Sequence, residues 1–289
     1  MKYFWFGLFL ICFSTFTLGT LDLRSDFDLK IFSEKQYFVG NDLGDFIENP
    51  ESLWGKESWF MWTIPTLVMF VYDRPLTQYY VDNLAPEWQS IAHRNWPLNF
   101  NRDDLLFEVN KYLFIYENLN PNPGLKRYVF CTSEALIDAF FVSQSLKHVF
   151  GRQRPSGLAR GGNPGRDYTH ITADPHNWFN FNFTPDGEFT SMPSTHGTVY
   201  FAHSTILGKA IDNELLGDVF GFLNYYIMPG NHMHWASDMW IGYVLGKAIG
   251  KYVWDRYEGE DLSDKWFVYP SFYPGEGRYY PVIAFWKMF

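Results

Sequence analysis

The segment "KHVFGRQRP" (residues 147–155) closes the longest helical pattern in this chain. The pattern begins near Leu125 and reaches Gly151. Pro155 disfavours the helical conformation for the residue before it, which turns Arg154 out of the helix. We therefore expect one long helix that ends before Arg154, with other helices packed around it.

Further helical patterns lie on both sides of this segment. They cover residues 58–82 (bent or broken near Pro65 and Pro75), 103–117, 195–211, 214–228 and 233–254. Residues 152–193 are rich in Gly, Pro, Asn and Asp and predict a long loop, and loops of this length in compact domains are usually functional or disordered. Near the C-terminus, Gly-Glu-Gly between two aromatic runs predicts a β-hairpin. The pattern favours an all-α fold, a helical bundle with a short C-terminal β-hairpin.

The first twenty residues are typical of an export signal, with Lys2 followed by a short apolar core and small residues. The rest of the chain, residues 21–289, contains no linker-like stretch and is long enough for one core, which predicts a single domain. Only one cysteine, Cys131, remains after such a signal is removed, so no intrachain disulfide is expected. We expect an exported protein, periplasmic or secreted.

Composition narrows the choice of partners. A net charge of −9 argues against nucleic acid or an anionic membrane surface as the main partner. The longest apolar run outside the signal is Trp59–Tyr72, "WFMWTIPTLVMFVY", which is shorter than the roughly 20 residues of a spanning helix and contains a proline. This run favours a buried core helix over a membrane span. Peripheral membrane contact through exposed aromatic side chains stays open.

Three polar motifs carry the chemistry, and the first is the opening segment. Lys147 and Arg154 are two helical turns apart, so their side chains leave from nearly the same face. A flexible point charge and a planar guanidinium that converge on one spot suit a phosphate. The alternative is a pair of solvated surface cations at a helix end.

The second motif is "SMPSTHGT", residues 191–198. Ser194 is a good N-cap for the helix that follows, and the backbone N–H groups of Thr195 and His196 would then lie at a positive helix start that attracts an anion. His196 would stand beside that anion and could give it a proton. The alternative is an ordinary capped helix with an incidental histidine.

The third motif is "NHMHWASDMW", residues 231–240. On a helix, His234 and Asp238 are spaced i, i+4, so the carboxylate can hold one ring nitrogen and leave the other as a nucleophile. The alternative is a zinc site formed by His232, His234 and Asp238, although no other matching ligands are present.

Together the three motifs resemble the signature of the type 2 phosphatidic acid phosphatase superfamily, which includes soluble acid phosphatases and vanadium haloperoxidases. That signature reads Lys-x6-Arg-Pro, then Pro-Ser-Gly-His, then Ser-Arg-x5-His-x3-Asp. Here "KHVFGRQRP" matches the first part, "PSTH" matches the second apart from Thr195, and "HWASD" matches the end of the third. The resemblance covers residues 125–255.

The resemblance implies a role for each matching residue. The implied phosphate cradle consists of Lys147, Arg154, Ser194 and the backbone of Thr195 and His196. His234 would be the nucleophile, Asp238 would orient it, and His196 would protonate the leaving group. Cations and amides would stabilise the transition-state charge, so the mechanism implies no metal and no cofactor.

The sequence departs from the family pattern at two places. Ile227 and Met228 stand where the third motif has Ser-Arg, so the second phosphate-binding arginine is missing. Thr195 stands where the second motif has glycine, which leaves the amide but adds a side chain near the anion. The candidates to replace the missing cation are His232, Arg152, Arg160 and Arg166.

The sequence thus predicts a metal-independent phosphatase that acts on a phosphomonoester or a lipid phosphate through a phosphohistidine. The main alternative is a catalytically inactive relative that binds phosphorylated ligands or has a structural role. A third reading is a vanadium-dependent haloperoxidase, because that branch holds vanadate in the same cradle. The oligomeric state is not determined by these patterns.

Overall fold

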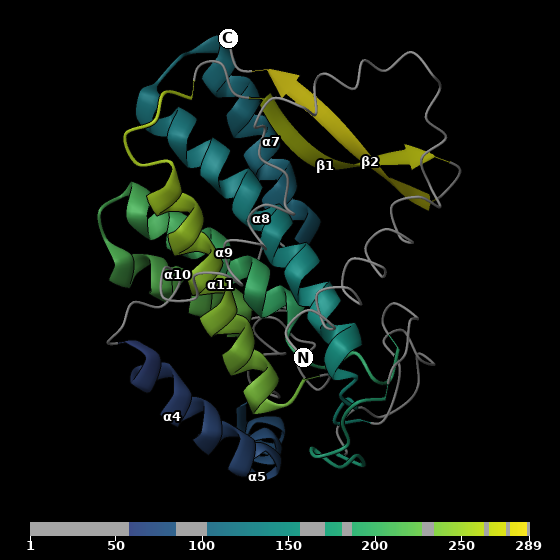
Figure 1. The fold of residues 1–289 in the computed structure, drawn as a ribbon. Coiled ribbons are helices and arrows are strands. Elements are labelled where there is room, and N and C mark those ends of the chain that lie inside the picture. The colour runs from purple at the N-terminus through teal and green to yellow at the C-terminus, as the bar shows by residue number, and fades with distance from the viewer. Residues whose placement is uncertain are drawn as a thin grey trace, which may run out of the picture. The chain divides into compact units, whose positions relative to one another are not determined.

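The computed structural model describes residues 58–84, 103–156, 171–180, 187–226, 234–262, 266–275 and 278–287. The predicted export signal, residues 1–20, lies outside this part. The described elements are the helices α4 (Ser58–Val71), α5 (Asp73–Tyr79), α7 (Asp103–Leu119), α8 (Pro123–Phe150), α9 (Thr195–Ala210), α10 (Glu214–Tyr226) and α11 (Ala236–Arg256), the π-helical turn η2 (Tyr80–Leu84), and the strands β1 (Trp266–Gly275) and β2 (Arg278–Lys287). The predicted all-α class is confirmed, and Figure 1 shows α8, α9, α10 and α11 as a bundle.

The long helix α8 has clear start and stop signals. The side chain of Asn122 accepts a hydrogen bond from the Leu125 amide, and Pro123 occupies the first turn. The helix ends at Gly151, which has φ +48°, and a side chain there would come within 2.4 Å of the Asn180 carbonyl oxygen. Only glycine fits this position. The helix therefore ends before Arg154, as predicted.

Helix α9 is the centre of the bundle and packs against α8, α10 and α11. Three glycines of α11, one helical turn apart, face the α9 backbone. At the middle one, Gly246, a Cβ would lie 2.4 Å from the Thr198 carbonyl oxygen, so the two backbones approach closely. The two helices run in the same direction, and the Ser194 amide donates to the Asp238 carbonyl oxygen (3.0 Å). The starts of α9 and α11 are thereby placed side by side.

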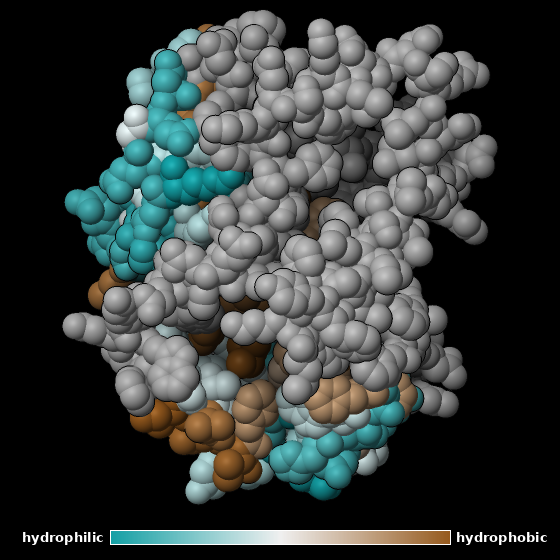
Figure 2. Space-filling model, viewed as in Figure 1, coloured by the Kyte–Doolittle hydropathy of each residue, from teal (hydrophilic) through white to brown (hydrophobic). Residues whose placement is uncertain are grey.

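Helix α4 corrects the prediction of a buried core helix. Its inner face packs on α11, where the Trp62 ring contacts Trp240 and Thr66 Oγ1 accepts a hydrogen bond from Trp240 Nε1 (3.1 Å). Its outer face is open, because Leu67 is 59% exposed and Val71 is 72% exposed. Figure 2 shows apolar side chains gathered where α4 lies in Figure 1. A uniformly apolar run carries no sequence signal for which face is covered, and this helix is covered on one face only.

Within the described ranges, no helix combines the length and the apolar character that crossing a membrane requires. The helical segment is interrupted at Tyr72, close to Pro75, and not at Pro65. Pro65 lies inside α4, and Pro75 lies in the first turn of α5, where the absence of an amide hydrogen costs little.

Beyond α11, strands β1 and β2 pair antiparallel, with Trp266 opposite Lys287. The residues that join them, 276–277, lie outside the described part.

Candidate active site

The two cations of the first motif meet at Thr190. Lys147 Nζ donates a hydrogen bond to the Thr190 carbonyl oxygen (2.7 Å), and Arg154 Nη2 donates to Thr190 Oγ1 (3.1 Å). The Arg154 amide also donates to the Glu188 carbonyl oxygen (2.8 Å), which holds the segment after α8 against the loop. Both side chains are buried. The alternative of two solvated surface cations is therefore wrong.

The second motif begins α9 as predicted. Ser194 is the N-cap, and its hydroxyl accepts a hydrogen bond from the Gly197 amide (3.3 Å). Thr195, the residue that replaces the family glycine, is buried, and its hydroxyl accepts a hydrogen bond from Gln144 Nε2 (3.2 Å). The added side chain is thus anchored to α8. His196 is half-buried in the first turn of the helix.

The third motif differs from its prediction in one respect. His234 precedes α11, whose N-cap is Trp235, so His234 and Asp238 do not share one helix. His234 Nδ1 lies 2.8 Å from the Ser191 carbonyl oxygen and 3.9 Å from Asp238 Oδ2. The expected hydrogen bond from His234 to Asp238 is therefore replaced by one to the Ser191 backbone. The prediction assumed a helix that already included His234.

The bond to Ser191 determines which nitrogen of His234 carries the hydrogen. A carbonyl oxygen can only accept, so Nδ1 is the donor and the lone pair of the neutral ring is on Nε2. Ser191 also links the ring to Asp238, because its hydroxyl donates to Asp238 Oδ2 (2.5 Å). The Trp235 amide donates to the same carboxylate oxygen (2.8 Å). Asp238 thus acts on His234 through Ser191 and through its charge.

Electrostatics keep the ring neutral and the carboxyl ionised. Burial lowers the pKa of His234 to about 3, and the charges of Lys147 and Arg154 lower it as well, against the opposing influence of Asp238. Burial alone would raise the pKa of Asp238, but the Arg152 guanidinium and the other donors bring it below its usual value. At neutral pH the site therefore combines an uncharged imidazole with an anionic Asp238.

Arg152 was one of the four candidates to replace the missing arginine, and its contacts exclude it from that role. Its guanidinium is fully buried and donates to Asp238 Oδ1 (2.6 Å), Ser237 Oγ (2.6 Å), Asp73 Oδ2 (2.5 Å) and the Pro175 carbonyl oxygen (3.0 Å from Nε and 2.9 Å from Nη2). These contacts use all five of its N–H groups. The guanidinium carbon, Cζ, lies over the Trp178 ring, 4.5 Å from its centre. Arg152 has no donor left for a phosphate.

The other three candidates, His232, Arg160 and Arg166, lie outside the described part of the chain, and so do Ile227 and Met228. Among the described residues, no group of three or more His, Cys, Asp or Glu side chains is placed to hold a metal ion. The zinc alternative depends on His232, which lies outside the described residues.

Sequence reasoning missed three residues of the site. Thr190 directly precedes the second motif and Ser191 is its first residue, and this position was their only signal. Asp73 gave no signal, because the contacts that place it in the site join it to residues distant in the sequence, 164 positions away in the case of Ser237.

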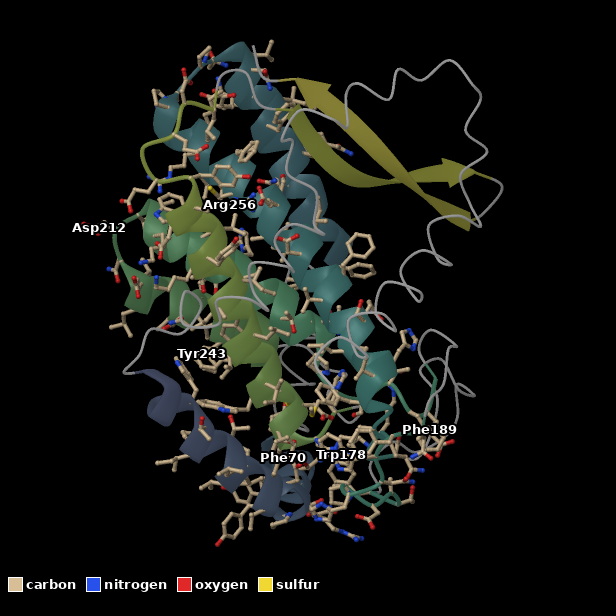
Figure 3. All side chains as sticks on the ribbon, viewed as in Figure 1. Phe70, Trp178, Phe189, Asp212, Tyr243 and Arg256 are labelled. Atoms are coloured by element: carbon tan, nitrogen blue, oxygen red, sulfur yellow. The ribbon has the colours of Figure 1, made fainter. Side chains whose placement is uncertain are left out.

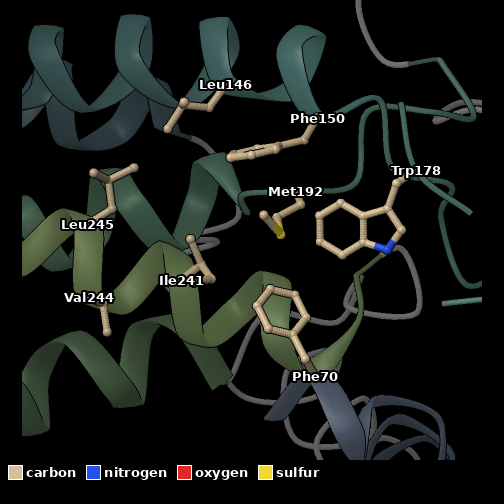
Figure 4. A pocket seen from close by; sticks show the side chains of 8 residues that line it. All are labelled: Phe70, Leu146, Phe150, Trp178, Met192, Ile241, Val244 and Leu245. Atoms are coloured by element: carbon tan, nitrogen blue, oxygen red, sulfur yellow. The ribbon is translucent and has the colours of Figure 1, made fainter. Parts of the chain in front are cut away.

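An apolar pocket of about 490 Å³ adjoins the polar residues. It is lined by Phe70, Leu146, Phe150, Trp178, Met192, Ile241, Val244 and Leu245, which Figure 4 shows. Met192 directly follows Ser191, and Leu146 directly precedes Lys147. Phe70 and Trp178, labelled in Figure 3, are in ring contact at 5.4 Å. The pocket meets the buried polar group at Met192, whose sulfur lies 3.9 Å from Arg152 Nη1.

Comparison with known proteins gives one match. The family described as PAP2 superfamily matches residues 128–260, a range that contains all three motifs but neither α4 nor α5. Neither the curated proteins nor the solved structures contain a match to this chain.

Proposed function

We propose that the chain is a metal-independent phosphatase that acts through a phosphohistidine, because residues 128–260 match the PAP2 superfamily, whose members are broadly phosphatases. The observation that carries this proposal is the state of His234. The ring is buried and neutral, and its Nδ1 hydrogen is held by the Ser191 carbonyl, so the Nε2 lone pair is available as a nucleophile.

In the proposed first step, Nε2 of His234 attacks phosphorus. The P–N bond forms while the bond to the ester oxygen breaks, and His196 gives its proton to the departing alkoxide. Lys147, Arg154 and the first turn of α9 offset the negative charge of the phosphoryl oxygens. The phosphorylated imidazole becomes positive, and the ionised Asp238 at 3.9 Å from Nδ1 stabilises it.

In the second step, water attacks phosphorus and gives a proton to His196. The P–N bond breaks, its electron pair returns to Nε2, and inorganic phosphate leaves. Every proton transfer is assigned to a residue of this chain, and the cycle restores the neutral ring.

The adjoining pocket supports an ester with an apolar group, a lipid phosphate, over a small polar phosphomonoester. All eight lining side chains are apolar or aromatic, and two of them, Leu146 and Met192, are next in sequence to Lys147 and Ser191. An apolar chain in this pocket would gain roughly 25 cal/mol for each Å² of surface removed from water. Selectivity for such esters should then appear mainly as a lower KM.

A second candidate is a catalytically inactive relative that binds phosphorylated ligands. The observation in its favour is Met228, which stands in place of the family arginine. Loss of an arginine that binds transition-state charge can lower a rate by about 10³-fold or more. The polar residues at Thr190 and Ser194 would still bind an anion without turnover.

The test compares turnover of an aryl phosphate and a short-chain lipid phosphate by the purified protein, with chelator present. We expect turnover that vanadate inhibits, an acid-labile phosphoprotein after rapid quenching, and at least about 10³-fold loss in His234→Ala. His176→Ala is the matched control, because this histidine is exposed on the loop. A folded protein that binds vanadate but hydrolyses neither ester would favour the inactive relative. Loss of activity on chelation, restored by zinc, would favour the metal site.

Export to the periplasm or the medium also remains a prediction, since residues 1–57 lie outside the described part. The exposed apolar face of α4 supports peripheral contact with a lipid surface, which co-sedimentation with vesicles would measure.

A further inference from the structure

Helix α5 supplies caps to the helix that follows the candidate nucleophile. Asp73 Oδ1 accepts a hydrogen bond from the Ser237 amide (2.7 Å), and Thr77 Oγ1 accepts one from the Ala236 amide (3.0 Å). The first amides of a helix have no acceptor within the helix, and a side chain from elsewhere can satisfy them. Asp73 and Thr77, one turn apart on α5, thus provide acceptors for two of the first amides of α11. Both are buried.

Asp73 also reaches Asp238 through Arg152. Its Oδ2 accepts from Arg152 Nη2 (2.5 Å) and from the Ser237 hydroxyl (2.6 Å). Arg152 Nη1 donates to that same hydroxyl and to Asp238 Oδ1, both at 2.6 Å. Asp73, Ser237, Arg152 and Asp238 therefore form one buried, hydrogen-bonded group.

The group contains one cation and two carboxylates. Burial raises the pKa of Asp73, and the charge of Asp238 adds to this, while Arg152 and Ser237 act in the opposite direction. The pKa of Asp238 is lowered. Both carboxylates accept hydrogen bonds from the same guanidinium. A change at Asp73 should therefore alter the hydrogen bond between Arg152 and Asp238.

We propose that Asp73 is a positioning residue for the candidate active site. Through Arg152 and Ser237 it holds Asp238 and the start of α11, and thereby the His234 ring, in the arrangement that phosphoryl transfer requires. Asp73 does not touch the substrate. It lies on α5, before the range that matches the family, so the functional unit of this chain extends beyond that range. This inference rests on the proposed function.

The main experiment compares Asp73→Asn with Thr77→Val in the full chain. Thr77→Val removes a cap from α11, whereas Asp73→Asn keeps an oxygen for the Ser237 amide but removes the charge and the acceptor that Arg152 contacts. For Asp73→Asn we expect kcat to fall about ten- to a hundredfold with KM within about threefold, since small misplacements of catalytic groups cost rate rather than binding. Thr77→Val should lose thermal stability while kcat stays within about threefold. Equal kcat in Asp73→Asn and wild type would overturn the proposal, and so would equal kcat losses in the two variants.

If Asp73→Asn does not fold, Ser237→Ala replaces it. This change keeps all three charges but removes the hydroxyl between Asp73 and Arg152. We expect at least a threefold fall in kcat, about the effect of one weakened contact. Wild-type kcat in Ser237→Ala would contradict the proposal.

A measurement independent of turnover separates this inference from the proposed function. Ring ¹⁵N chemical shifts of His234 should report a single neutral tautomer with hydrogen on Nδ1 in the wild type, and a mixture of tautomers in Asp73→Asn. If the folded wild type hydrolyses no phosphate ester, the proposed function fails, and the ¹⁵N comparison still tests the positioning. Identical ring shifts in the two proteins would overturn it.

Discussion

Two buried carboxyl groups of this protein, on Asp238 and Asp138, have opposite surroundings. Asp238, at the start of α11, accepts hydrogen bonds from Arg152, Ser191 and the Trp235 amide, and its pKa is lowered. Asp138, in the middle of α8, has neither oxygen hydrogen-bonded within the part of the chain that is described. Burial raises its pKa to about 8. The first is charged at neutral pH and the second is largely protonated.

The comparison separates the effect of burial on a carboxyl pKa from the effect of hydrogen-bond donors and a nearby cation. Both side chains are removed from water, which penalises the ionised form in each case. Only Asp238 receives donors, and these come from three segments that the fold brings together. A functional carboxylate in this bundle therefore depends on long-range contacts, whereas a carboxyl group without them becomes a neutral core group.

Arg152→Met should have the largest effect on this comparison, because it leaves both Asp73 and Asp238 without their cation. We expect a loss of about 3–5 kcal/mol in the free energy of unfolding at pH 7, measured by urea denaturation. The loss should shrink as the pH falls toward 4 and below, where the stranded carboxyl groups bind protons.

Arg127→Met is the control for this change, since Arg127 stacks on Trp254 at 4.1 Å and donates to its carbonyl oxygen. Its effect should be smaller and nearly independent of pH. Equal losses for the two arginines would mean that Arg152 serves packing rather than charge.

Asp138→Asn should have a smaller effect with a distinct pH dependence. The pKa is about 8 in the folded protein and 3.8 in the reference state, so the native protein binds the extra proton between these values. Wild-type stability should then fall as the pH rises from about 4 to 8, by at most about 1.4 kcal/mol per pH unit. The Asn variant lacks this pH dependence. Its free energy of unfolding relative to wild type should therefore increase as the pH rises.

Asp238→Asn should reveal a pH dependence of stability with the opposite sign. Its carboxyl has a lowered pKa, so its contribution is present above pH 4 and disappears as the pH falls through the folded value. Urea midpoints at several pH values would show both slopes. Parallel curves for Asp138→Asn and wild type would show that Asp138 is ionised at neutral pH after all.

Ser191→Ala should have the smallest effect of the four changes. It removes the hydroxyl that donates to Asp238 and leaves the carbonyl that holds His234. We expect a loss of about 2 kcal/mol in unfolding free energy, since hydrogen bonds to charged groups exceed neutral ones. Ser143→Ala is the matched control, because this buried hydroxyl donates only to the Phe140 carbonyl of its own helix. A loss no larger than that of the control would contradict a charged acceptor at Asp238.

The helices and the motifs could be predicted from the sequence because their signals are local. Asn122, Pro123 and Gly151 delimit α8 through contacts with near neighbours in the chain. Lys147 and Arg154 were assigned to one site from their spacing, and both contact Thr190. The exposure of α4 could not be predicted, since an apolar run reads the same on each of its faces.

The two arginines of "GRQRP" have different roles, and their sequence neighbours do not reveal which role each one has. Its two arginines are two positions apart and chemically identical, and sequence reasoning considered both for the phosphate. One of them, Arg152, is instead enclosed by two carboxylates, the nearer of which in sequence is 79 positions away. From the sequence, Asp238 was likewise expected to hold one ring nitrogen of His234, whereas Nδ1 is held by the Ser191 carbonyl from a distant loop.

The sequence by itself determined most of the helix boundaries, such as both ends of α8 and the start of α9, and which residues could carry phosphate chemistry. Capping, the breaks at proline and helical periodicity act within a few residues, so the chain order contains them. Only the tertiary structure decided that Asp73 supports the site, that Ser191 holds His234, and that Asp238 is charged while Asp138 is not. These outcomes depend on which donors reach a buried group from distant segments, and the close packing of α9 on α11 brings those segments together.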